Sequence, residues 1–330
     1  MASHPCGQSR VALAVAIVLA LLNVALAAGG QQAERVYRVG LVSLGGDPQW
    51  WRPVLEAMVE LGYVEGRNLV VRRAFAKGRA EDLPRLVGEL LRLGVDVVLT
   101  TAARETRVVK QAAPNTPIVM LLVPDPVAEG FVTTLAHPGG NVTGLTIFAP
   151  SFVQKYVELL REVLPSASRF VVLGNPGGPP PGIRAELESA ARTFGIMLSI
   201  IPVSGPDEID AALARAKREG AAGLIDAPNY VTFIHRRRLA QAALKYGMPG
   251  IYWAREYAQD GGLLTYSPDM TELRRRAATF ADKILKGTRP SDLPVEQPTK
   301  FELVINLKTA RSLGLTIPPS LLLRADQVIE

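Results

Sequence analysis

The sequence predicts an α/β protein made of two doubly wound, parallel-sheet lobes with a ligand cleft between them. Short, near-continuous apolar runs rich in β-formers alternate with segments of helical apolar spacing. This alternation is typical of parallel sheets covered by helices on both faces, because parallel strands need crossover helices. The series occurs twice, on either side of a turn-rich segment at 137–141, and 330 residues are enough for two lobes of about 130–150 residues.

The first series predicts a lobe that begins at residue 36. Its first unit is a strand at 36–43, a Gly-Gly-Asp-Pro loop and a helix whose apolar spacing runs to Gly62. The elements that follow are strands at 68–75, 95–99, 117–123 and 142–147, with helices around 83–91 and at 103–113. The last strand leads out of the lobe toward the second series.

The second series has the same architecture without sequence repetition. It predicts helices at 151–164, 183–194, 206–219 and 230–246, with strands at 169–173, 196–203, 222–225 and 250–252. We expect 262–266 and a helix at 271–285 to return to the first lobe, and residues 301–306 to cross a third time. The first lobe would then comprise 36–147 plus about 262–295, and the second 148–261 plus about 296–330.

The N-terminus predicts export to the periplasm. An uncharged apolar run at 11–27 follows Arg10 and ends in Ala25-Leu26-Ala27, which is typical of a secretory signal peptide cleaved near Ala27, so that 1–27 would be removed. The alternative is an uncleaved anchor, although the run is slightly short for a membrane span. The only cysteine, Cys6, precedes the run instead of following it, so we do not expect a lipoprotein.

Composition argues against several classes of function. The net charge of +6 is spread along the chain without a basic tail, so a nucleic-acid partner is not expected. The chain after residue 27 has no cysteine, and His137 and His235 lack the spacing of metal ligands. Nucleophile-elbow, zincin, phosphate-loop and dinucleotide motifs are also absent from the sequence. We therefore predict no catalytic residue, metal or cofactor; an exported hydrolase that uses a carboxylate pair is the alternative.

The candidate ligand site lies in the loops after the strands. In open α/β sheets, ligands bind outside the carboxyl ends of the strands. The candidates are Ser43, Gly45, Gly46, Thr101, Ala102, Asp125 and Thr146 from the first lobe, with Asn175, Asn229, Trp253 and Glu256 from the second. The hydroxyls of Ser43 and Thr101 with nearby amides suit a carboxylate, and Asp125 or Glu256 suits an ammonium group. Trp253 suits stacking. Such a set indicates a small amino-acid-like ligand.

Each of these residues has a structural alternative. Asp125 and Asn175 directly precede proline and are common turn formers. Thr101 is equally suited to cap the helix that follows it. Trp253 is equally suited to the core or to a lobe interface.

Four motifs, in order along the chain, resemble a known family. They are Glu60-Leu-Gly-Tyr-Val-Glu-Gly-Arg-Asn68, Asp125-Pro-Val127, Pro138-Gly-Gly-Asn-Val-Thr-Gly144 and Leu293-Pro-Val-Glu-Gln-Pro-Thr-Lys-Phe-Glu-Leu-Val-Ile-Asn-Leu-Lys308. Together they resemble the ABC-transporter substrate-binding proteins related to the tryptophan/tyrosine-binding type. The resemblance implies a periplasmic-binding-protein fold of class I. It also implies a monomer that closes on a small ligand and delivers it to a membrane permease with its ATPase; a periplasmic sensor is the alternative.

One segment departs from this family. Where relatives carry Gly-Gly-Thr-Pro-Ala-Ala after the third strand, this chain has Thr101-Ala-Ala-Arg-Glu-Thr106, so the hydroxyl and the helix start are rearranged. The resemblance therefore does not carry an aromatic amino-acid ligand over to this chain. Arg104 would favour a more anionic ligand; alternatively, Arg104 and Glu105 form a solvated first helical turn.

Overall fold

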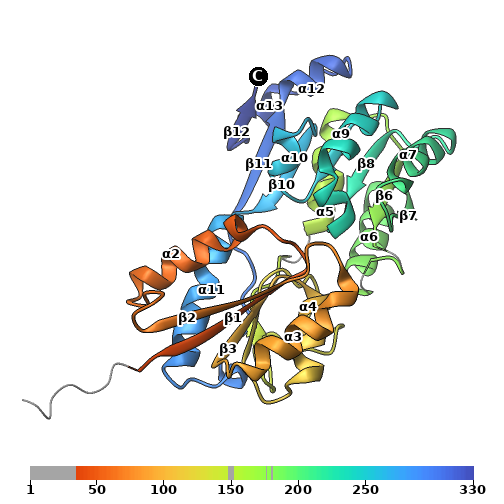
Figure 1. Cartoon of the computed structure of the whole chain (residues 1–330). Coiled ribbons are helices and arrows are strands. Elements are labelled where there is room, and N and C mark those ends of the chain that lie inside the picture. The colour runs from red at the N-terminus through yellow and green to blue at the C-terminus, as the bar shows by residue number, and fades with distance from the viewer. Residues whose placement is uncertain (1–34, 148–151, 176, 180) are drawn as a thin grey trace, which may run out of the picture.

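The chain folds into two lobes, each built around one sheet (Figure 1). The structure, a computed structural model, describes residues 35–330 except 148–151, 176 and 180. The apolar run at 11–27, and with it the predicted signal peptide, lies outside the described residues. Within the described ranges, no helix is both long enough and apolar enough to span a membrane.

The first lobe has a five-stranded, all-parallel sheet in the order β2-β1-β3-β4-β5. Its strands are β1 (Tyr37–Ser43), β2 (Leu69–Phe75), β3 (Val97–Thr100), β4 (Ile118–Met120) and β5 (Val142–Gly144). Its helices are η1 (Pro48–Trp51), α2 (Arg52–Glu60), η2 (Ala80–Asp82), α3 (Leu83–Arg92), α4 (Ala103–Ala112), α11 (Met270–Leu285) and η3 (Pro290–Asp292). α2 packs with α11, and α3 packs with α4, so helices cover both faces of the sheet.

The second lobe repeats this strand order and extends it, giving β12-β11-β10-β9-β8-β6-β7. The strands are β6 (Arg169–Gly174), β7 (Met197–Pro202), β8 (Gly223–Asp226), β9 (Gly250–Tyr252), β10 (Leu264–Pro268), β11 (Phe301–Asn306) and β12 (Gln327–Ile329). The helices are α5 (Phe152–Val163), α6 (Pro181–Phe194), α7 (Glu208–Arg218), α8 (Tyr230–Ile234), α9 (Arg236–Lys245), α10 (Glu256–Gln259), α12 (Leu307–Ser312) and α13 (Pro319–Leu322). Among the strands that the structure describes in this lobe, only β10 and β11 pair antiparallel. The prediction of two doubly wound parallel sheets is therefore confirmed.

Two predictions about the second lobe are wrong. Residues 262–266 were expected to return to the first lobe, but β10 pairs in parallel with β9 and stays in the second sheet, because the open edge of β9 satisfies its backbone groups. A single helix was expected at 230–246. The backbone of His235 leaves the helical region there, with φ −104° and ψ 26°, so α8 and α9 are separate helices.

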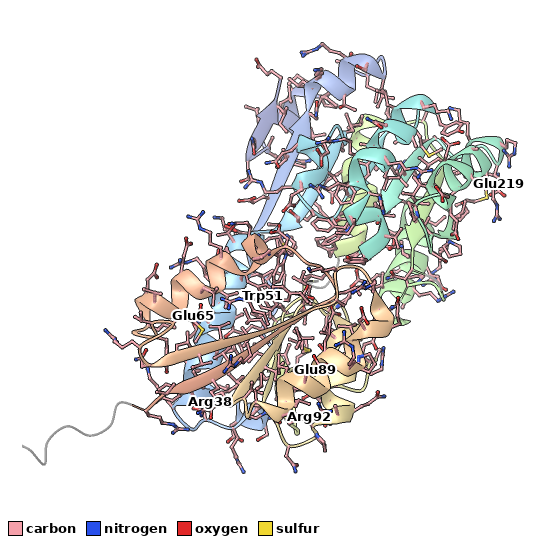
Figure 2. All side chains as sticks on the ribbon, in the orientation of Figure 1. Arg38, Trp51, Glu65, Glu89, Arg92 and Glu219 are labelled. Atoms are coloured by element: carbon pink, nitrogen blue, oxygen red, sulfur yellow. The ribbon has the colours of Figure 1, made fainter. Side chains whose placement is uncertain are left out.

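Apolar side chains fill both faces of the sheets. Figure 2 shows Trp51 among the side chains of the first lobe, where it is buried against α2. A separate cluster, which we call the α3–α4 core, lies under those two helices and includes Val42, Leu83, Val98 and Ile118. These residues hold the loops after β1 and β3 in fixed positions.

The chain passes between the lobes three times: after β5, between β10 and α11, and before β11. The first and third crossings run side by side, because Leu145 forms a parallel bridge with Glu296. The Glu296 N–H donates to the Gly144 carbonyl at 2.9 Å, and the Thr146 N–H donates to the Glu296 carbonyl at 3.0 Å. Gly144 is required at this point: its φ is +133°, and a Cβ would lie 2.0 Å from the Met120 carbonyl oxygen.

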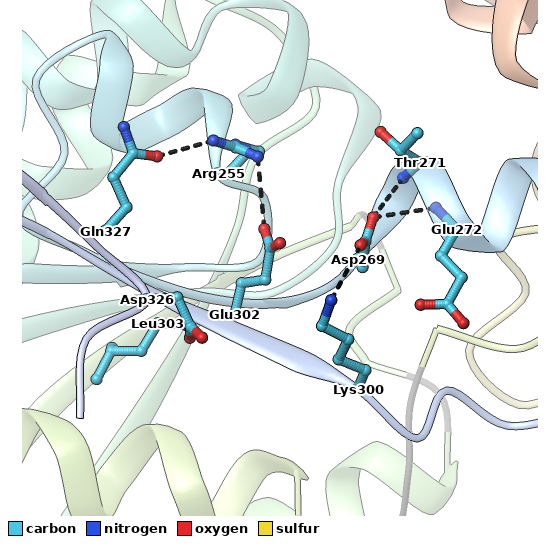
Figure 3. A network of polar contacts seen from close by, with 9 residues as sticks. All are labelled: Arg255, Asp269, Thr271, Glu272, Lys300, Glu302, Leu303, Asp326 and Gln327. Atoms are coloured by element: carbon cyan, nitrogen blue, oxygen red, sulfur yellow. Dashed lines mark hydrogen bonds and ion pairs between the residues drawn. The ribbon is translucent and has the colours of Figure 1, made fainter.

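The second and third crossings are joined by Asp269 (Figure 3). The Asp269 Oδ1 accepts hydrogen bonds from the N–H groups of Thr271 and Glu272, both at 3.0 Å, and so caps α11. Its Oδ2 lies 3.7 Å from the Lys300 Nζ, and the Asp269 N–H donates to the Lys300 carbonyl at 3.3 Å. One side chain thus fixes where α11 begins and where β11 approaches.

We expect Asp269→Ala to lower the free energy of unfolding by about 1 kcal/mol, because α11 loses its N-cap. Asp207→Ala is a matched control, since Asp207 precedes α7 but makes no capping hydrogen bond; its effect should stay within about 0.5 kcal/mol. Urea denaturation of both variants measures the difference. Equal effects of the two substitutions would contradict a capping role for Asp269.

Candidate functional site

The carboxyl ends of the two sheets carry the loops that meet between the lobes. In each sheet the order of connection reverses at one point: between β1 and β3 in the first, and between β6 and β8 in the second. Ligands of open α/β proteins bind outside such switch points. The loops after these four strands therefore form the candidate site, and we call the region where they meet the interlobe face.

The lobes contact each other at this face through Tyr230. Tyr230 begins α8 in the second lobe, yet its ring packs against the α3–α4 core of the first lobe. Its hydroxyl lies 3.6 Å from the position that a Cβ on Gly78 would occupy. Burial raises the pKa of the Tyr230 phenol, and the negative charge of Glu105 raises it further.

A second contact joins Asp125 of the first lobe to the start of α6 in the second. A Cβ added to Gly182 would lie only 2.6 Å from the Asp125 Oδ2. The Asp125 Oδ1 accepts the Ala128 N–H at 3.0 Å, so Asp125 also has the turn role that its place before proline suggested. Glycine at position 182 therefore permits the close approach of the two lobes.

The hydroxyls after β1 and β3 converge in the first lobe. The Thr101 Oγ1 lies 3.5 Å from the Ser43 Oγ, which accepts the Gly45 N–H at 3.0 Å. The neighbouring Gly46 lies against the side chain of Lys77, whose Cγ is 2.9 Å from a Cβ position on that glycine. Ala102 provides no side-chain cap to α4. The predicted first-lobe residues 43–46 and 101–102 thus form one group.

Glu105 is a site residue that the sequence did not reveal. A solvated first turn was expected for Arg104 and Glu105; Arg104 is exposed, but only 2% of Glu105 is. The Glu105 Oε1 accepts the Leu44 N–H at 2.8 Å and the Thr101 hydroxyl at 2.6 Å. The prediction that Glu105 is solvated is wrong because Leu44, in the loop after β1 and 61 residues earlier in the chain, donates its backbone N–H to the Glu105 carboxylate.

The asparagines of the second lobe hold loops together. The Asn229 Oδ1 caps α8 by accepting the Val231 N–H at 2.7 Å, and its Nδ2 donates to the carbonyls of Gly174 and Val203. The Asn175 Nδ2 donates to the Pro228 carbonyl at 3.0 Å. The loops after β6 and β8 are therefore joined, and the amide of the buried Asn229 is fully used by the protein.

Trp253 packs within the second lobe. Its ring centroid lies 5.0 Å from that of Phe233 and 6.4 Å from that of Tyr257, and only 8% of the residue is exposed. Its position is that of a packed aromatic residue, in agreement with the structural alternative.

Glu256, on α10, carries a buried Oε2 atom without a hydrogen-bond partner. It acts electrostatically on Arg274 of α11, whose pKa is lowered by burial and raised by the charges of Glu256 and Asp269. The Arg274 guanidinium donates to the carbonyls of Met270 and Trp50 and lies over the Trp50 ring. Thr146, the remaining predicted residue, is buried in the first crossing.

Asp226, the last residue of β8, begins the candidate strand-end loop 226–230, but no individual role was predicted for it. It is fully buried, and neither carboxylate oxygen has a hydrogen-bond partner of normal geometry. Burial raises the pKa of Asp226 to about 7, which the nearby hydroxyls of Tyr257 and Thr232 only partly offset. An acid directly after the apolar run 222–225 is the sequence signal that would have identified it.

One further hollow lies away from the predicted residues. A depression of about 330 Å³ runs along η1 and α2 to the start of β2, and none of the predicted site residues lines it. Within the described ranges, no group of three or more histidines, cysteines and acids is arranged to hold a metal ion.

This architecture is that of the class I periplasmic-binding-protein fold. The chain superposes on a conserved domain protein from Vibrio cholerae with a TM-score of 0.83 and 26% identity, covering 89% of this chain and 100% of that one. It superposes equally well on the ABC domain from Streptococcus pneumonia in complex with L-Trp, with a TM-score of 0.82, 23% identity, and coverage of 89% and 100%.

Sequence comparison identifies the family. The model of the family described as ABC transporter substrate binding protein matches residues 48–329, so the chain belongs to that family. It is also 22% identical over 263 residues to a tyrosine-binding protein from Clostridioides difficile, covering 79% of this chain and 75% of that one. The resemblance carried by the four motifs is confirmed.

We expect Asp226→Asn to change how stability depends on pH. A folded pKa of about 7, above the reference value of 3.8, means that the folded state binds more protons, so wild-type stability falls as pH rises from about 4 to about 7. The asparagine variant lacks this loss. The free energy of unfolding of the variant, relative to that of wild type, should therefore rise by about 2–3 kcal/mol between pH 5 and pH 8, measured by urea denaturation. Parallel pH profiles for Asp226→Asn and wild type would contradict the shifted pKa; Asp207→Asn, at an exposed site, is the control.

Proposed function

We propose that the chain is the periplasmic solute-binding component of an ABC importer, which holds a small ligand between its lobes and delivers it to a membrane permease. The observation that carries the proposal is the contact between the two lobes at their carboxyl-end loops, through Tyr230, which follows β8, and through Asp125, which follows β4, with Gly182. A ligand seated between these loops touches both lobes at once. It therefore binds the touching arrangement better than a separated one and shifts the population toward it.

The crossings support movement of the lobes as two bodies. Three segments connect the lobes, and they are tied to one another by the bridge from Leu145 to Glu296 and by Asp269 with Lys300. Rotation at these segments leaves each sheet intact, as in hinge closure around a ligand. The permease would then recognise the closed form, and no bond of the ligand is made or broken.

The proposed ligand is small and amino-acid-like. Asp125 and Glu256 are the acids of the predicted set, and the buried, unbonded Oε2 of Glu256 suits an ammonium group. The L-Trp complex and the tyrosine-binding relative support a ligand of this size and kind. Export by cleavage near Ala27, a soluble monomer and the absence of a lipid anchor complete the proposal.

A thermal-shift screen tests binding. We expect at least one compound among the twenty amino acids, their decarboxylated amines and small carboxylates to stabilise the protein. At a ligand concentration of ~100 times the dissociation constant, binding raises the free energy of unfolding by about 2.7 kcal/mol. A protein that responds to no compound in this panel, and that carries no bound solute by native mass spectrometry, would argue against a solute receptor of this kind.

Gly182→Ala tests closure. The added methyl group meets the Asp125 carboxylate only when the lobes touch, so we expect ligand affinity to fall about tenfold or more, equivalent to about 1.4 kcal/mol. The stability of the empty protein should not fall, because alanine suits a helix better than glycine. Gly205→Ala, which adds a methyl group with no neighbour within 4 Å, is the control. Unchanged affinity in Gly182→Ala, by titration calorimetry, would contradict closure at this contact.

A further inference from the structure

We propose that Glu105 sets the ligand specificity of the first lobe: its buried carboxylate occupies the place of a ligand anion, so the ligand presents an amine there and carries no carboxylate. This inference rests on the proposed function and changes its ligand from an amino-acid-like solute to an amine without a carboxylate. It replaces the carboxylate that the sequence assigned to Ser43 and Thr101.

Three of the donors that would hold a ligand carboxylate are already in use. The Leu44 N–H and the Thr101 hydroxyl both donate to the Glu105 Oε1, at 2.8 and 2.6 Å. The Gly45 N–H donates to the Ser43 Oγ at 3.0 Å. These donors lie at the switch point between β1 and β3, where an anionic ligand would need them. Glu105 therefore accepts hydrogen bonds from donors that an anion-binding site would otherwise offer to the ligand.

Glu105 also brings a charge without a counter-charge. Glu105 is only 2% exposed. Among the described residues, no lysine, arginine or histidine forms an ion pair with it. A carboxylate at this position attracts a cation and repels a second carboxylate beside it. A ligand ammonium group supplies the missing charge.

The position of Glu105 is at the interlobe face. Its charge acts on the phenol of Tyr230, which comes from the opposite lobe. A ligand held between the lobes near Thr101 is therefore within the field of this carboxylate.

The cations around the site do not cancel that charge. Arg104, the next residue, is exposed, and so is Lys77 beside Gly46. Arg274 donates to the carbonyls of Met270 and Trp50 and lies in the field of Glu256. Glu105 thus forms no ion pair or hydrogen bond with any of these three cations, and its charge remains available to a ligand.

The test compares two pairs of probes that differ only in the carboxylate: tyramine with L-tyrosine, and tryptamine with L-tryptophan. By titration calorimetry, we expect the wild-type protein to bind at least one amine tenfold or more tightly than its amino acid. Glu105→Gln keeps an oxygen acceptor for Leu44 and Thr101 but removes the charge, so the ratio should fall toward one. Glu89→Gln, on the exposed side of α3, should leave the ratio unchanged.

Three results would overturn the inference. The first is tighter binding of either amino acid than of its amine by wild type. The second is an unchanged ratio in a Glu105→Gln variant that melts like wild type. The third concerns a protein that binds neither pair of probes. If the solute identified in the thermal-shift screen then carries a carboxylate or lacks an amine, the inference about Glu105 is wrong, while the solute-receptor function still holds. An amine without a carboxylate supports the inference, and a protein that binds no solute at all overturns both proposals.

Discussion

The arrangement of the two lobes depends on the three chain crossings that join them. The first and third share a parallel bridge at Leu145 and Glu296, and the second is tied to the third by Asp269. Because these links lie between the sheets, each lobe keeps its own packing while the angle between them is set by a few backbone segments. The opposed loops, their contacts and any ligand between them all follow from this narrow connection.

Most of the fold could be predicted because parallel sheets leave a strong local signature. Buried strands and amphipathic helices alternate at their own periods, and the strand predicted at 169–173 differs from β6 by one residue. The helices α10, α12 and α13 were not predicted, since four to six residues are too few to show a helical period. The lobe to which β10 belongs depends on its pairing partner, which local spacing does not report.

The site could be predicted in location more than in chemistry. Ligands of open α/β sheets bind outside the carboxyl ends of the strands, and this rule, which depends on topology alone, pointed to the loops that meet between the lobes. Asn229 lies in one of those loops, and its cap of α8 is a local contact, but its Nδ2 also donates to the carbonyls of Gly174 and Val203, which are distant in sequence. Glu105 and Tyr230 each act on a segment that is distant in sequence, so no local pattern distinguishes them from surface residues.

The approach of Asp125 to Gly182 has a practical consequence. These residues belong to different lobes, so under the closure proposed above the separation of their backbones would change with ligand occupancy. Residues 35–330 contain no cysteine in the sequence. Two thiols introduced on exposed positions beside this contact would be the only labelling sites in that part of the chain. A dye pair attached there would turn the protein into an optical sensor for its own ligand.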